Sequence, residues 1–208
     1  MKRLLAFTLF FALCLTGCAE LSDFKAPAPR FDTLSIAYAE PLLDYSPLRY
    51  NSADRKYLGN IYEPLLRFDG SFNMESALAV SWGRLDEYTW DFQLRQGVQF
   101  HTGETFDADD ALYSLSLAKA QGDSELGALL STLSEVQKTG DYRFTLRTTQ
   151  PDPLLLNKLS YVYMLPEGYV DFKLPIGTGP YRVSAFSQNT LTLERFESYW
   201  GPLAFFPL

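Results

Sequence analysis

The chain has 208 residues, of which 47% are apolar and 15% aromatic, and its formal net charge at pH 7 is −7. This composition excludes a largely disordered protein, and the acidic balance argues against binding nucleic acid through its phosphates. The length is sufficient for one domain with a sizeable core, so we expect a globular protein without a nucleic-acid partner.

The first residues predict an export signal rather than part of the fold. A basic start at residues 1–3 precedes an apolar run over residues 4–15, which ends in Leu-Thr-Gly-Cys. This order is typical of a bacterial lipoprotein signal over residues 1–17, with the thiol of Cys18 as the site of lipid attachment and palmitate as an expected acyl group. The alternatives are an ordinary secretory signal with a stray cysteine, or an uncleaved anchor.

The cysteines and charges of the exported part follow from this signal. Cys14 leaves with the signal and Cys18 carries lipid, so no thiol remains for a disulfide, a metal or a nucleophile. Loss of Lys2 and Arg3 leaves 16 basic against 25 acidic side chains, a formal charge of −9. We expect an acidic domain in the cell envelope, facing the periplasm or the cell exterior and held at the membrane by its lipid.

A short tether precedes the domain. Residues 18–32 are mostly polar and contain two prolines, which is typical of a linker. The domain is then expected over residues 33–208. Its first element is a strand at residues 33–39, where apolar and polar residues alternate and Tyr38 is expected in the core. A helix is expected over residues 52–66, with regular helix ending near Glu63 because Pro64 follows.

The central part of the chain predicts a strand, a glycine turn and a capped helix. Residues 88–94 alternate as a half-buried strand does, and two glycines, Gly97 and Gly103, mark the reversal. Asp107 is the expected N-cap of the helix, and Asp109 and Asp110 fall in its first turn. Capping explains these carboxylates better than a calcium loop, which needs a different spacing.

The remaining pattern predicts an α/β fold with a mixed sheet and flanking helices. Further helices are expected at residues 124–136 and 151–159, and further strands at 141–147, 181–186 and 190–196. The expected core residues are Trp90, Phe92, Leu94, Leu112, Leu115, Phe144, Leu146 and Tyr181.

Five motifs in order resemble the extracytoplasmic solute-binding proteins of peptide and nickel ABC importers (family 5). They lie at residues 61–65 (Ile-Tyr-Glu-Pro-Leu), 76–82, 90–114, 175–181 (with Gly-Thr-Gly-Pro-Tyr) and 198–201 (Ser-Tyr-Trp-Gly). The resemblance implies the first lobe of a type II periplasmic-binding-protein fold. Family members have a second lobe, which is missing here, so we expect a truncated form.

The resemblance also implies a function. It predicts a lipid-anchored substrate-binding component of a peptide importer, which is not an enzyme and needs no cofactor, with a peptide and the importer's permease subunits as partners. It places the ligand-facing rim at Tyr50, Asn51 and Ser52, where backbone groups can pair with an extended peptide. One lobe offers a ligand one wall, so binding by this chain alone is expected to be about millimolar or weaker.

Other functions have less support in the sequence. Residues 177–179 (Gly-Thr-Gly) lack the spacing and the lysine of a phosphate loop and are expected to form a turn that holds two segments together. His101 is the only histidine and is expected to be an exposed turn residue, not a metal ligand. The runner-up is an envelope lipoprotein that keeps the lobe as a structural or interaction module. The only support in the sequence for an exported hydrolase is the presence of serines and aspartates in no specific pattern.

Overall fold

A computed structural model of the protein describes residues 33–39, 42, 45–49, 52–122, 124–187 and 190–202. The described residues belong to one compact unit that begins at Thr33. The predicted signal, tether and Cys18 lie outside the described residues and remain predictions. None of the helices in the described part is long and apolar enough to cross a membrane.

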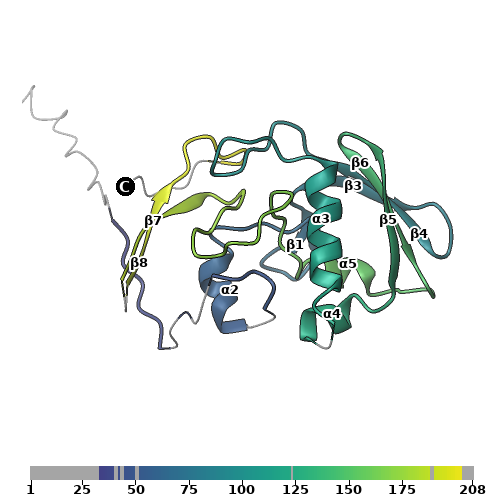
Figure 1. Ribbon diagram of the computed structural model, residues 1–208, viewed down its shortest axis with the longest axis horizontal. Helices are drawn as coiled ribbons and strands as arrows, with labels where there is room; N and C mark the ends of the chain where they lie inside the picture. Colours follow the sequence, from purple (N-terminus) through teal and green to yellow (C-terminus); the bar gives the residue numbers. More distant parts are fainter. Residues whose placement is uncertain are drawn as a thin grey trace, which may run out of the picture. The chain divides into compact units, whose positions relative to one another are not determined.

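The described part contains helices and strands in which every strand pairs antiparallel to its neighbour (Figure 1). The helices are α2 (Ser52–Leu58), α3 (Ala108–Lys119), α4 (Glu125–Leu129) and α5 (Leu155–Leu159). The strands are β1 (Leu66–Phe68), β2 (Met74–Ser76), β3 (Ala79–Arg84), β4 (Thr89–Leu94), β5 (Leu133–Gly140), β6 (Arg143–Thr148), β7 (Tyr181–Ser187) and β8 (Thr190–Arg195).

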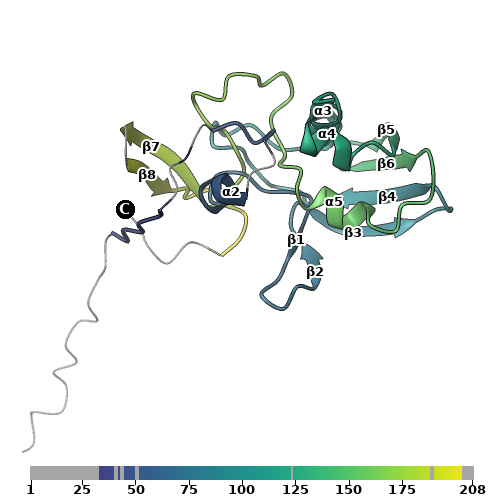
Figure 2. The same ribbon diagram turned by 90° about the horizontal axis from the view of Figure 1, so that it is seen from below.

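The largest sheet has the strand order β3-β4-β6-β5, and α3 packs against its β5 and β6 strands (Figures 1 and 2). Alternation along β4 directs Phe92 and Leu94 into the core, and Phe92 lies opposite Phe144 of β6. Their rings stack at 5.0 Å between centroids. On the other face, Asp91 forms an ion pair with Arg143 at 2.8 Å. The sheet is therefore apolar on one face and polar on the other.

Helix α3 begins at the predicted cap. The Asp107 carboxylate accepts from the Asp109 N–H at 2.8 Å, and the Asp107 N–H donates to the Asp110 carboxylate at 2.9 Å, which completes a capping box. Further along the helix, Ser114 accepts from the backbone N–H of Leu165 at 2.8 Å and so fixes a distant loop to α3.

The α/β class is confirmed, with three corrections to its elements. All pairings among the described strands are antiparallel, so the sheet is not mixed in this part of the chain. Residues 33–39 form no strand, and Leu34 and Ile36 are 55% and 61% exposed. Tyr38 is 42% exposed and contacts the ring of Tyr57 instead of the core. The segment pairs with none of the described strands, so alternation alone does not make it a strand.

Three predicted helices are also shorter than expected, and the one expected over residues 151–159 begins only at Leu155. The helix expected over residues 52–66 ends at Leu58, and Leu66 already belongs to β1. The helix expected over residues 124–136 ends at Leu129, and its last residues form the start of β5. A register shift between Leu133 and Glu135 places Leu133 and Val136 toward the core, and this spacing of three resembles a helix.

Five of the eight predicted core residues are fully buried. These are Phe92, Leu94, Leu115, Phe144 and Leu146. Trp90 and Leu112 are only partly buried and pack against the edge of this core. Tyr181 at the start of β7 is also partly buried, outside both apolar clusters.

The two leucines of α3 provide a test of its orientation. Leu115→Ala should lower the free energy of unfolding by on the order of 2–5 kcal/mol, because the side chain is fully buried. Leu112→Ala should cost roughly half as much, because part of that side chain already contacts water. Urea denaturation of both variants measures the difference, and equal losses would show that α3 is rotated from the position described.

Candidate functional site

Glu63 lies at the centre of a buried polar cluster. Its residue is 5% exposed, and its two carboxylate oxygens accept three hydrogen bonds. The donors are the Tyr199 hydroxyl at 2.8 Å, the Trp200 indole N–H at 2.7 Å and the Thr178 hydroxyl at 3.0 Å. Burial raises the pKa of Glu63, although the three hydrogen bonds and the charge of Arg67 oppose the shift. We call Glu63, Thr178, Tyr199 and Trp200 the Glu63 cluster.

The glycines around Thr178 allow the chain to approach residues 60 and 61. A Cβ on Gly177 would lie 2.0 Å from the Ile61 carbonyl oxygen, and one on Gly179 would lie 2.6 Å from that of Asn60. No side chain fits at either position. The Gly179 N–H donates to Ile61 at 2.9 Å. The segment therefore joins two parts of the chain, as the sequence suggested.

His101 holds the same segment from the other side. Its backbone N–H donates to the Gly177 carbonyl at 2.9 Å, and its Nδ1 accepts from the Gly177 N–H at 3.3 Å. Its Nε2 lies 3.0 Å from the Gly179 carbonyl. Because Nδ1 accepts, the neutral ring carries its proton on Nε2 and donates it to Gly179. His101 lies in a turn as predicted, but the prediction that it is exposed is wrong, since the residue is only partly exposed.

A cavity of about 370 Å³ lies beside the Glu63 cluster. Its walls come from four parts of the chain, which are residues 55–68 from α2 to β1, residues 160–163 after α5, Pro180 and Tyr199. It is lined by Arg55, Gly59, Tyr62, Glu63, Pro64, Arg67, Phe68, Ser160, Tyr161, Tyr163, Pro180 and Tyr199. The volume falls within the range of small-ligand pockets, and the walls combine aromatic rings with a few charged groups, as such pockets do.

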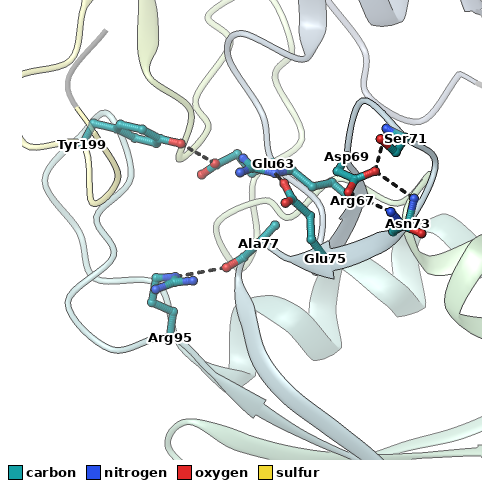
Figure 3. A network of polar contacts seen from close by, with 9 residues as sticks. All are labelled: Glu63, Arg67, Asp69, Ser71, Asn73, Glu75, Ala77, Arg95 and Tyr199. Atoms are coloured by element: carbon teal, nitrogen blue, oxygen red, sulfur yellow. Dashed lines mark hydrogen bonds and ion pairs between the residues drawn. The ribbon is translucent and has the colours of Figure 1, made fainter.

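Two arginines supply positive charge to this cavity. Arg67 of β1 pairs with Glu75 of β2 at 2.6 Å, and it lies between Glu63 and Glu75 in Figure 3. Arg55 of α2 lies over the rings of Tyr161 and Tyr163, with 4.9 and 4.6 Å from its Cζ to the ring centroids. Its two terminal nitrogens donate to the carbonyls of Tyr161 and Ser160 at 3.1 and 3.0 Å. Arg55 is thereby held in one orientation at the cavity wall.

The predicted rim residues remain untested by this geometry. Tyr50 and Asn51 lie outside the described residues, and Ser52 is described only as the first residue of α2. Sequence reasoning missed Arg55, Tyr161 and Tyr163. The available signal was the Tyr-Val-Tyr spacing at residues 161–163, which places two rings on one side of an extended segment. Within the described residues, no group of three His, Cys, Asp or Glu could hold a metal.

The comparisons with known proteins show the family to which this chain belongs. Residues 73–205 match the family of bacterial extracellular solute-binding proteins, family 5 (middle region), and the chain belongs to that family. The curated relatives include the HTH-type transcriptional regulator SgrR of Escherichia coli K12, 28% identical over 177 residues. That match covers 81% of this chain and 31% of the relative, so the chain spans about a third of the length of the curated relatives it matches.

Solved structures of binding proteins have the same fold. The oligopeptide-binding protein AppA of Bacillus subtilis, in complex with a nonapeptide, matches with a TM-score of 0.70 and 26% identity over 76% of this chain and 35% of AppA. NikZ of Campylobacter jejuni, in complex with Ni(L-His), matches with a TM-score of 0.75 and 24% identity over 83% of this chain and 37% of NikZ. These comparisons identify the described part as the first lobe of the type II binding-protein fold.

His101 predicts a pH dependence of stability. Burial lowers the pKa of His101 from 6.5 to about 4, with a smaller contribution in the same direction from the charge of Arg182, against the hydrogen bond to Gly179. The unfolded chain therefore binds more protons between these values, and the stabilisation by His101 is present above pH 6.5 and lost as pH falls toward 4. The stability advantage of wild type over His101→Gln should shrink by on the order of 3 kcal/mol across that window.

The quantity to compare is the difference in the free energy of unfolding between wild type and His101→Gln, because Asp110 titrates over the same pH range. Burial raises the pKa of Asp110 from 3.8 to about 6, so its contribution is lost as pH rises and has the opposite sign. Asp110 is present in both proteins and cancels. Urea denaturation between pH 4 and 7 provides the measurement, and a difference that does not change with pH would show that His101 keeps an ordinary pKa.

Proposed function

We propose that this protein is the lipid-anchored substrate-binding component of an ABC importer for peptides. The observation that carries the proposal is the family match over residues 73–205, together with the likeness to a peptide-bound binding protein, AppA. The basic start, apolar run and Leu-Thr-Gly-Cys sequence support a lipid at Cys18. Its partners would be a peptide and the permease subunits of the importer, in the cell envelope.

The proposed mechanism is reversible binding without covalent chemistry. A peptide would pair its backbone with the rim at Tyr50, Asn51 and Ser52, as an added strand does. Ser52 begins the helix that carries Arg55. The name of SgrR supports a second candidate, in which the same domain serves a protein other than an importer, as an interaction module without solute transport.

Peptide binding distinguishes these two functions. Calorimetric titration of the 208-residue chain with a mixed pool of di- to pentapeptides should give saturable binding, about millimolar or weaker, because one lobe buries only part of a ligand. A heat signal that saturates supports a solute-binding protein. Absence of any saturable signal up to the solubility limit of the pool would favour the interaction module.

The lipid anchor has an independent test. Cys18→Ser removes the only thiol at the expected acylation site, so the protein should move from the membrane to the soluble extracytoplasmic fraction and lose its labelling by radioactive palmitate. Cys14→Ser is the matched control and should change neither result. Membrane association and labelling that persist in Cys18→Ser would refute the lipoprotein assignment.

A further inference from the structure

The guanidinium of Arg55 is fixed by hydrogen bonds, and it has no acidic partner among the described residues. A guanidinium has five N–H donors, and two of them are used by the Ser160 and Tyr161 carbonyls. The remaining contacts of its side chain are with the aromatic faces of Tyr161 and Tyr163, which leave its other donors available. Arg55 forms no ion pair with any carboxylate in this part of the structure.

The other charged groups of the cavity already have partners. Glu63 receives three hydrogen bonds from the Glu63 cluster, and these occupy both of its oxygens. Arg67 is paired with Glu75. A ligand that enters the cavity therefore meets one cation whose charge is not neutralised by the described residues, and that cation is Arg55.

The walls around Arg55 also restrict the ligand. Aromatic and proline side chains line most of the cavity, including Tyr62, Tyr163, Phe68 and Pro180. Aromatic and proline walls favour a ligand with an apolar or aromatic body, because burial of apolar surface is favourable. The two carbonyls use two of the five guanidinium N–H donors of Arg55, and a guanidinium with donors to spare is well suited to bind a carboxylate.

We infer that this cavity binds the carboxylate of a small ligand with an apolar body, and that Arg55 is the residue that determines this specificity. The inference rests on the proposed solute-binding function and names the ligand chemistry for it. The carboxylate can belong to the carboxyl terminus of a short peptide or to a free organic acid, and both present the same group to Arg55.

The preference for a carboxylate in the ligand is tested first, because this experiment needs no protein variant. The probes are N-acetylphenylalanine and the dipeptide Ala-Phe, each compared with its carboxyl-terminal amide by ligand-observed NMR titration of the 208-residue chain. Amidation removes the negative charge and leaves the apolar body unchanged. We expect each amide to bind about tenfold more weakly than its acid, or worse. Tighter binding of Ala-Phe than of N-acetylphenylalanine would identify a peptide, and the reverse a free organic acid.

A matched pair of variants then identifies the residue. Arg55→Gln should weaken binding of both acids to the level of their amides and leave binding of the amides unchanged. Arg84→Gln is the control, because Arg84 also lies over a ring, that of Trp90 at 5.5 Å, and donates to a carbonyl, that of Glu87 at 3.0 Å. Arg84 lines a different cavity, beside Asp86 and Glu87, so its loss should change no affinity. Urea denaturation of both variants checks that the fold is retained.

The outcomes separate this inference from the proposed function. Equal affinity of acid and amide for the wild-type chain overturns the inference and leaves solute binding intact. Binding of none of the four probes refutes both. Should Arg55→Gln fail to fold, the comparison of acids with amides on the wild-type chain decides the question by itself.

Discussion

The buried carboxylate of Glu63 is the constraint on which the rest of this lobe depends. The residues that donate its three hydrogen bonds follow Glu63 in the chain by 115, 136 and 137 positions. Burial of a carboxylate costs free energy unless its oxygens accept hydrogen bonds. Loss of one of the three donors would leave part of the buried carboxylate unsatisfied. Three of the family's motifs therefore have to meet at one point, and the glycines beside Thr178 are required for the chain to come close enough.

The Glu63 cluster also positions the cavity, because Glu63 and Tyr199 belong to both. The motif residues fix the wall, whereas Arg55, Tyr161 and Tyr163, which give the cavity its charge and aromatic faces, lie outside the five motifs. This division has a physical reason. Residues that satisfy a buried network cannot vary without loss of the fold, while residues that face an open cavity can change with the ligand.

The sequence predicted those features that depend on local chemistry or on apolar alternation. The capped start of α3, the β4 strand and the β7–β8 hairpin are of this kind. Prediction from the sequence failed for features that depend on contacts between residues far apart in the chain. A bulge in β5 imitated a helical spacing, residues 33–39 alternate but form no strand, and His101 is partly buried against a segment 76 positions away. The cavity could not be predicted, because its walls come from four separate parts of the chain.

The long separations in the Glu63 cluster have a consequence for how the protein is made. Glu63 cannot acquire its full set of donors until Trp200, 137 positions later, has been synthesised. Closing so large a loop has an entropic cost that local contacts do not repay, and a topology rich in such distant contacts folds slowly. During synthesis the nascent chain therefore keeps this carboxylate hydrated and the lobe incomplete until Trp200 is available to donate to it.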